Sequence, residues 1–276
     1  MPSATANKVR KQPYHPSLFS VVKYLVRPES QTFAFSVATM AVLSFFPFMV
    51  VLIMLIRRGI ESPAMYGVLL QIIRDHLPIG QELVIKTLNG LVNARKGAQI
   101  GSLVLLLIAS RGVFLPLEVA LNRVWGFAKS RNWAHNQMVG VGLTFLCGLL
   151  ALISIALTAG NQYLLTEVLG KKHAFVRLGT FLVMKLIATV ASVTIFFLIY
   201  WLIPAGKVQA RQVFPAALLF GLLWELLKYG YILLLPHMSF QEVYGPFGVS
   251  VALLFWGYIS GLVMLAGAFF SAGRRN

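Results

Sequence analysis

Charged residues are scarce in this chain of 276 residues, and acidic ones are the scarcest. Charged residues make up 12% of the chain, against about 25% in an ordinary soluble domain, and 58% of its residues are hydrophobic. So little charge cannot cover the surface of a globule in water. The composition therefore excludes an ordinary soluble domain and predicts a protein surrounded mostly by lipid.

Other absences narrow the chemistry. The chain has 8 acidic residues and 5 histidines, and neither set shows the spacing of metal ligands. It contains no Walker A loop, no HExxH sequence and no Gly-x-Ser-x-Gly turn. The single cysteine, Cys147, excludes an intramolecular disulfide. We therefore expect no metal, no cofactor and no enzyme, and a membrane-embedded hydrolase or nuclease is the least favoured function.

Basic residues outnumber acidic ones, 24 to 8, which gives a formal net charge of +16. In a soluble protein this excess would suggest nucleic-acid binding. Here the cations lie between apolar runs, where they anchor membrane spans beside anionic headgroups. Membrane lipids are therefore the expected partners, and nucleic acid is not.

Six apolar runs reach the roughly 20 residues that a helix needs to cross the hydrocarbon core. They are Gln31–Ile56, Gln99–Leu121, Met138–Gly160, Leu178–Ile203, Phe214–Leu235 and Phe247–Ala272. The sequence thus predicts an all-α polytopic membrane bundle of six transmembrane helices over residues 31–273. Residues 1–30 form a cytoplasmic or interfacial segment before it, in which Ser30 can cap the first helix and Glu29 suits its positive end.

Residues 57–98 differ from the spans, because charges interrupt their short apolar runs. This spacing predicts one or two amphipathic helices, either lying at the membrane interface or packed on the bundle. They form an extramembrane insertion too small to be a separate domain. Aromatic residues near span ends fit an aromatic belt. These are Trp125, Trp133, Tyr200 and Trp201.

Six spans place both termini on one side of the membrane. Leaving the long first loop aside, that side holds 12 Lys and Arg, and the opposing short loops, 161–177 and 236–246, hold 3. The positive-inside rule then places both termini in the cytoplasm, although the first loop holds 6 further cations on the other side.

Several motifs, taken in order, resemble the YihY/BrkB family of bacterial inner-membrane proteins, once described as ribonuclease BN. The resemblance covers residues 20–273. Its motifs are Leu43-Ser44-Phe45-Phe46-Pro47, Ala120-Leu121-Asn122-Arg123-Val124-Trp125, Trp224-Glu225-Leu226-Leu227-Lys228, Tyr244-Gly245, Trp256-Gly257-Tyr258-Ile259-Ser260 and Leu265-Ala266-Gly267-Ala268.

The resemblance implies a six-span inner-membrane protein with suggested roles in moving lipids or other solutes and in virulence. One position departs from the family, which commonly has an acid after Gly-Ala near the end of the last span. Here Phe269 takes its place. Any role that such an acid has, for example in ion coupling, is therefore in doubt for this chain.

Charges inside the spans are the candidate site, because each costs a few kcal/mol at the centre of the bilayer. The candidate substrate-binding residues are Arg111, Glu118, Asn122, Lys185, Glu225 and Lys228. Glu225 and Lys228 are three apart on one helix face and can pair. The five charged residues of this set could line one polar interior and bind a ligand, or could only pair to orient the helices. Arg111 is the first candidate, since its planar fork suits a phosphate or carboxylate.

Other features have two readings each. Lys185 could bind substrate or simply extend to the interface. Pro47 could mark a hinge or only kink the first span. The Tyr244-Gly245 turn could be a gate or a rigid connector. Glycines 257, 261 and 267 in the last span most simply allow close helix packing.

Cations at depth favour a transporter or flippase for an anionic lipid or other amphiphilic solute, such as an anionic phospholipid. A noncatalytic membrane scaffold or regulatory subunit is the alternative. A homo-oligomer is compatible with either function.

Overall fold

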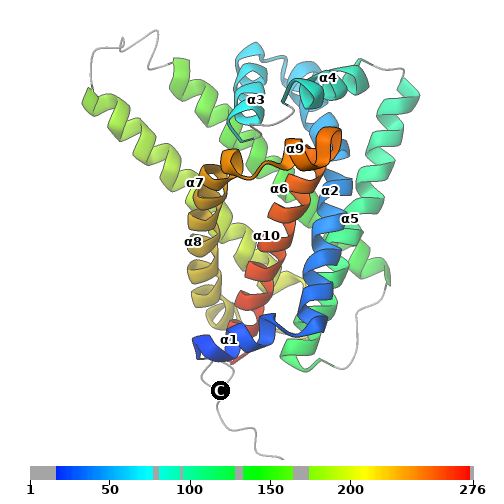
Figure 1. Ribbon diagram of the computed structural model, residues 1–276, viewed down its shortest axis with the longest axis vertical. Coiled ribbons are helices and arrows are strands. Elements are labelled where there is room, and N and C mark those ends of the chain that lie inside the picture. Colours follow the sequence, from blue (N-terminus) through cyan, green and yellow to red (C-terminus); the bar gives the residue numbers. More distant parts are fainter. Residues whose placement is uncertain (1–16, 77–80, 94–95, 128–132, 164–173, 274–276) are drawn as a thin grey trace, which may run out of the picture.

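The computed structural model describes residues 17–76, 81–93, 96–127, 133–163 and 174–273, and most of these residues are helical. Six long helices form the bundle (Figure 1). They are α2 (Pro28–Met54), α5 (Lys96–Trp125), α6 (Trp133–Tyr163), α7 (Ala174–Leu202), α8 (Ala210–Leu234) and α10 (Gly248–Gly273). The described residues also form four shorter α-helices, α1 (Leu18–Leu25), α3 (Pro63–His76), α4 (Gln81–Val92) and α9 (Phe240–Tyr244), and the short π- and 3₁₀-helical segments Leu55–Ile60, Leu235–His237 and Gly245–Phe247.

Within the described part of the chain, five helical segments are long and apolar enough to cross a membrane. They are Pro28–Ile60, Gln137–Gly160, Leu182–Leu202, Ala210–His237 and Gly248–Gly273. The sixth long helix, α5, has 30 residues. At a rise of 1.5 Å per residue it extends about 45 Å, which exceeds the roughly 30 Å of hydrocarbon. The all-α polytopic membrane bundle is therefore confirmed, with α5 as a long helix that carries internal charges.

Helices α2 and α10 approach each other closely at the centre of the bundle. A Cβ atom placed on Gly257 would lie 3.0 Å from the Cα of Ala38, and one on Gly261 would lie 3.1 Å from the Cα of Ala34. Small residues on both helices thus bring the two backbones together, as glycines do in membrane helices. Gly267 likewise has the Tyr200 ring where a side chain would be. The predicted role of these glycines in packing is confirmed.

The buried apolar residues form two cores: a lower one that reaches α1, at the bottom of Figure 1, and an upper one that reaches α3 and α4, at its top. The lower core joins α2, α5, α7, α8 and α10 and includes Ala34, Leu117, Phe196, Ala217 and Leu265. The upper core joins α2, α3, α4 and α6 and includes Val50, Ile53, Leu69, Leu88 and Ile155.

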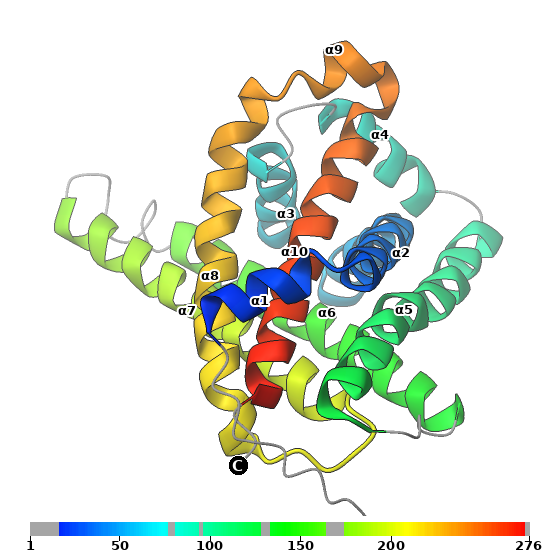
Figure 2. The same cartoon turned by 60° about the horizontal axis from the view of Figure 1, so that its bottom comes forward.

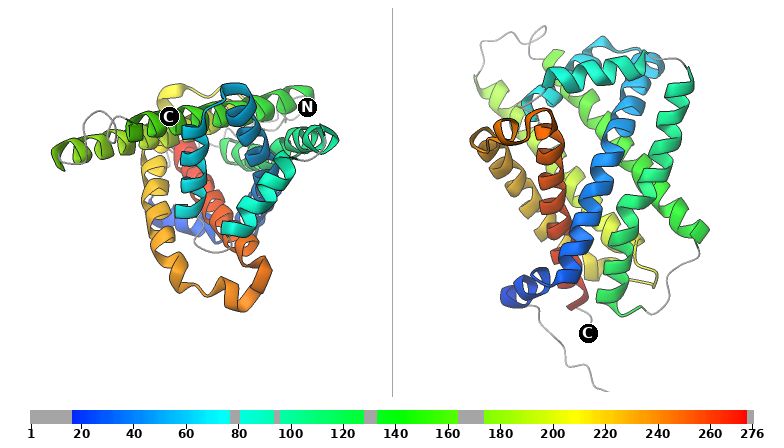
Figure 3. Two further views of the ribbon diagram at one scale, coloured as in Figure 1. Left: turned by 90° about the horizontal axis from the view of Figure 1, so that it is seen from above. Right: turned by 45° about the vertical axis from the view of Figure 1, so that its right-hand side comes forward.

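The segment after α2 folds back over the end of the bundle. A π-helical turn, Leu55–Ile60, continues α2, and Glu61 then adopts a left-handed φ of 55°, which reverses the chain. Helix α3 buries Val68, Leu69 and Ile73 on one face, and α4 lies across the end of the bundle (Figure 3). The amphipathic pattern over 57–98 therefore produces helices packed on the bundle.

Helix α1 crosses the opposite end and packs against α10 (Figure 2). The Tyr24 and Phe269 rings stack there with centroids 4.5 Å apart. Gln31 accepts a hydrogen bond from the Tyr258 hydroxyl and donates one to the carbonyl oxygen of Leu25 at 2.7 Å. Phe269, at the position of the family's acid, thus forms an apolar contact that fixes α1.

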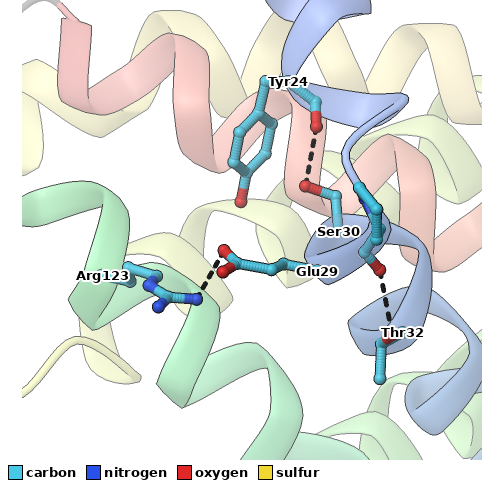
Figure 4. Close-up of polar contacts among 6 residues, drawn as sticks. Tyr24, Glu29, Ser30, Thr32 and Arg123 are labelled. Carbon is cyan, nitrogen blue, oxygen red and sulfur yellow. Dashed lines mark hydrogen bonds and ion pairs between the residues drawn. The ribbon is translucent and has the colours of Figure 1, made fainter.

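The turn from α1 into α2 corrects one prediction. Arg27 is the N-cap of α2 and Pro28 its first residue, which suits a proline that lacks an N–H. Ser30 does not cap α2: its hydroxyl donates to the carbonyl oxygen of Tyr24, in the last turn of α1, at 2.8 Å (Figure 4). Glu29, in the first turn as expected, forms an ion pair with Arg123 of α5 at 2.6 Å.

Two aromatic residues expected in an interfacial belt are buried, and that prediction was wrong for them. Tyr200 is 0% exposed and Trp125 is 4% exposed. The Tyr200 hydroxyl donates to the carbonyl oxygen of Met264 at 3.0 Å, so its polar end is satisfied inside the bundle. Trp201 is 41% exposed, as a belt residue would be. The side chain of Trp133 lies outside what the structure describes.

Candidate functional site

Glu225 and Lys228 form an ion pair on α8. The Nζ of Lys228 lies 2.7 Å from an Oε atom of Glu225, and the two side chains are 21% and 8% exposed respectively. One helical turn separates the residues, which places both on the same face. The hydroxyl of Ser192 on α7 donates to the second carboxylate oxygen of Glu225. The buried carboxylate is thus held from two helices.

Tyr229 brings a second cation to this pair. The Nζ of Lys185, on α7, lies 3.5 Å from the centroid of the Tyr229 ring, and the Nζ of Lys228 lies 5.4 Å from it. Lys185 sits near the middle of α7, because the helix begins at Ala174 and not at the predicted Leu178. Its ammonium reaches across to α8, where a cation over an aromatic face is stabilised.

Lys228 also lines a cavity of about 370 Å³ between α2, α3, α6, α8 and α10. The other lining side chains are almost all apolar, with Ser154 and Tyr231 as the neutral polar exceptions. Trp256 forms one wall, and its ring stacks on Tyr231 with centroids 5.0 Å apart. A volume of this size lies in the range of small-ligand pockets. The arrangement offers one ammonium group to the head of an amphiphile and an apolar surface to its chain.

Two further cavities adjoin this Lys228 cavity. One, of about 240 Å³, lies between α2, α5, α7 and α10 and shares the walls Phe45, Leu253 and Trp256. The other, of about 170 Å³, lies between α2, α5 and α6 and shares Phe48 and Leu52. The side chains of α2 therefore stand between the Lys228 cavity and both of its neighbours.

Glu118 and Asn122 lie elsewhere, on α5, and both are buried. The Oδ1 of Asn122 accepts the backbone N–H of Ala205 at 2.7 Å, and its Nδ2 donates weakly to Glu118 at 3.4 Å. Neither residue lines the Lys228 cavity. Asn122 therefore fixes the chain that follows α7, and the structure groups Lys185, Glu225 and Lys228 without Glu118 and Asn122. Arg111 lies on α5, but its side chain is outside the described part.

The candidate hinge residues lie beside the cavity or at a turn. Pro47 is buried inside α2, between the cavity-lining Phe45 and Phe48. Gly245 follows Tyr244 with a φ of +53°, a conformation that suits glycine at a tight turn between α9 and α10. The role of Pro47, Tyr244 and Gly245 as a hinge or gate stays a prediction.

Sequence reasoning missed Ser192, Tyr229 and Trp224. The Nζ of Lys228 lies 5.2 Å from the centroid of the Trp224 ring, and the Trp224 Nε1 donates to the Ser260 hydroxyl at 2.9 Å. Ser192 could have been found, because it lies seven residues after Lys185 and therefore on the same face of α7. Among the described residues, no group of three or more His, Cys, Asp or Glu could hold a metal ion.

The comparisons with known proteins agree with this architecture. A family model described as virulence factor BrkB matches residues 21–276. A UPF0761 membrane protein of Chlorobium chlorochromatii is 30% identical over 172 residues, which are 62% of this chain and 39% of the relative. One from Pseudoalteromonas atlantica is 29% identical over 177 residues, 64% of this chain and 57% of the relative. One from Alteromonas mediterranea is 26% identical over 204 residues, 71% of this chain and 66% of the relative.

The matched part therefore spans less than two thirds of the length of each of these curated relatives. No solved structure matches the chain. The relatives are named as membrane proteins, and the family model covers nearly the whole sequence. This chain is an integral membrane protein that belongs to the BrkB family.

Proposed function

We propose that this protein moves an anionic amphiphile, a phospholipid in the simplest case, across the bacterial inner membrane. The observation that carries the proposal is the position of Lys228, whose side chain is the one charged group among the residues that line an apolar cavity of about 370 Å³. Such a cavity matches a molecule with an anionic head and an apolar chain.

The surroundings of Lys228 support a site that accepts anions. The described residues place two ammonium groups, those of Lys185 and Lys228, around the ring of Tyr229, and the carboxylate of Glu225 beside Lys228. A phosphate could bind Lys228 while Glu225 keeps the bond from Ser192. Intramembrane charges of this kind line substrate paths more often than they decorate a lipid-facing surface.

A scaffold or regulatory subunit is the second candidate, and one observation favours it. Lys228 is already paired with Glu225 at 2.7 Å, and Ser192 of α7 donates to Glu225, so this arrangement could simply hold α8 against α7 without binding a ligand. A transporter should transfer lipid without any partner protein, and a scaffold should not. Reconstitution of the purified chain in vesicles distinguishes the two functions.

We place both termini in the cytoplasm. Helix α1 and the end of α10 lie at the same end of the bundle (Figure 1), and the excess of cations in the short loops favours the inner side for this end. Phe19, Val22 and Val26 are exposed on one side of α1, beside Lys23 and Arg27. An apolar face flanked by cations suits the anionic inner leaflet.

The test is lipid transfer by the purified chain in vesicles. Phosphatidylglycerol and phosphatidylcholine carrying a fluorophore on one chain are reconstituted with the protein, and dithionite added outside reports how much label crosses. We expect wild-type protein to speed the transfer of phosphatidylglycerol above the protein-free rate. Lys228→Gln should slow it about tenfold, since a hydrogen bond to a charged group contributes roughly 1.5–3 kcal/mol.

Two variants serve as controls. Lys228→Arg keeps the charge and should retain transfer, and Lys207→Gln removes an exposed cation outside the cavity and should change nothing. Transfer at the protein-free rate for every lipid with wild-type protein would contradict the proposal and favour the scaffold.

A further inference from the structure

The small cavity between α2, α5 and α6 faces the surroundings of the bundle. Its volume is about 170 Å³, and Thr144 is the one polar side chain among its lining residues. Several of its walls are exposed: Leu103 by 46%, Phe145 by 75% and Leu149 by 43%. In a membrane-spanning bundle these walls contact hydrocarbon. We call this cavity the lateral groove.

The lateral groove and the Lys228 cavity lie on two sides of the same side chains. Phe48 and Leu52 line both of them. On the groove side the Phe48 ring lies against Gly148 of α6, where an added Cβ would be 3.7 Å from the Phe48 Cε2. The thickness of one or two side chains therefore separates an apolar volume with a cation from an apolar volume open to lipid.

We infer that the ligand is an anionic lipid with two acyl chains, which straddles Phe48. Its head binds at Lys228, one chain fills the Lys228 cavity and the second chain lies in the lateral groove. The position of the head rests on the proposed function, whereas the groove position of the second chain rests on the shared walls. An amphiphile with a single chain would occupy the Lys228 cavity and would not enter the groove.

The groove suits the second chain better than the cavity of about 240 Å³ does. None of the side chains that line that cavity is exposed, whereas the groove has exposed walls at Leu103, Phe145 and Leu149, so only the groove offers a chain an exposed apolar surface. A chain in the lateral groove stays in contact with hydrocarbon while the head moves into the bundle. Only the chain that enters the Lys228 cavity therefore leaves the bilayer.

The experiment fills the groove and compares lipids that differ in chain number. Gly148→Leu puts a branched side chain against Phe48, and Gly142→Leu on the same helix is the matched control, because Gly142 has open space around it and does not line the groove. Native mass spectrometry of the purified full chain measures binding of phosphatidylglycerol, lysophosphatidylglycerol and phosphatidylcholine.

We expect Gly148→Leu to weaken phosphatidylglycerol binding about tenfold, because crowding an already filled apolar site typically costs about 1–3 kcal/mol. Lysophosphatidylglycerol, with one chain, should bind Gly148→Leu as it binds wild type. Gly142→Leu should bind all three lipids like wild type. Gly148→Ala, which adds one carbon at an ordinary contact distance, should have a small effect of the same sign.

Three results would overturn the inference. In the first, Gly148→Leu weakens binding of phosphatidylglycerol and lysophosphatidylglycerol equally, and in the second it weakens binding of neither. In the third, it weakens phosphatidylcholine binding as much as phosphatidylglycerol binding, which would show that only surrounding bilayer lipid fills the groove. Failure of the proposed transport function can be distinguished from failure of this inference. If Gly148→Leu weakens phosphatidylglycerol binding while wild-type protein transfers no lipid, the groove site stands and transport does not.

Discussion

The ammonium group of Lys228 lies 2.7 Å from a carboxylate oxygen of Glu225, one turn earlier on α8, and both groups are largely shielded from the surroundings. The carboxylate is held by Ser192 as well, whereas the ammonium extends to the wall of the cavity. The two partners are therefore not equivalent: Glu225 is fixed between α7 and α8, and Lys228 is the one positioned to exchange partners.

Removing one charge of this pair should cost more than removing both. Glu225→Gln leaves Lys228 charged in an apolar wall, and we expect a loss of about 3 kcal/mol in the free energy of unfolding. The double variant Glu225→Gln/Lys228→Met removes both charges and should fall within about 1 kcal/mol of wild type. Thermal unfolding in detergent, followed by tryptophan fluorescence, measures both. A double variant no more stable than Glu225→Gln would contradict the pairing.

The close contact of α2 with α10 predicts opposite effects for the same substitution at two glycines. Gly257→Ala places a Cβ 3.0 Å from the Cα of Ala38, and crowding of this kind typically costs about 1–3 kcal/mol. Gly230→Ala on α8 meets nothing within 4 Å and should stabilise the helix by up to about 1 kcal/mol. The melting temperatures of the two variants should therefore lie on opposite sides of wild type.

The contact of Lys185 with Tyr229 depends on the ring and not on its hydroxyl. Tyr229→Phe keeps an aromatic face and should alter stability little, whereas Tyr229→Leu removes the face and should cost about 1–2 kcal/mol. In a Lys185→Met background the difference between the Phe and Leu variants should shrink to what ring packing and the more distant Lys228 contact at 5.4 Å contribute. A difference as large as in the wild-type background would contradict a stabilising contact between Lys185 and the ring.

Orientation can be measured with single cysteines in a Cys147→Ala background. Lys86→Cys on α4 should react with a membrane-impermeant maleimide added outside intact cells, because we place α3 and α4 on the outer side. Lys207→Cys lies in the connection between α7 and α8, at the end of the bundle where α1 lies (Figure 1), and should react only after the cells are opened. Both positions are exposed, so accessibility alone does not decide the result. The reverse pattern would invert the topology.

Much of the fold could be predicted because hydrophobic length is a local property of the sequence. Uncharged runs revealed α2, α6 and α10 directly, and glycines at 257 and 261 indicated a close helix contact. Helix ends were less certain. Pro28 begins α2 three residues early, and α5 continues through Pro116 to Trp125, since contacts with other helices decide where a helix frays.

The candidate site was only partly visible. The pairing of Glu225 with Lys228 follows from their spacing on one helix, and the structure confirms the contact. Three parts of the arrangement arise from contacts between helices that no single helix face reveals. These are the cation over Tyr229, the bond from Ser192, and the separation of Glu118 and Asn122 from Lys228. That Phe45 and Phe48 line a cavity likewise could not be predicted, because the cavity is formed only when α3, α6 and α8 pack around them.

The contact of α2 with α10 also divides the molecule into parts with different freedom to move. Ala34 and Ala38 meet Gly257 and Gly261 almost backbone to backbone, so these two helices cannot slide past each other by a fraction of a turn without a clash. Among the described residues, no glycine of α3, α6 or α8 brings its helix this close to the backbone of α2. Alternating exposure of the Lys228 cavity to the two leaflets would therefore leave the α2–α10 pair stationary and displace the surrounding helices.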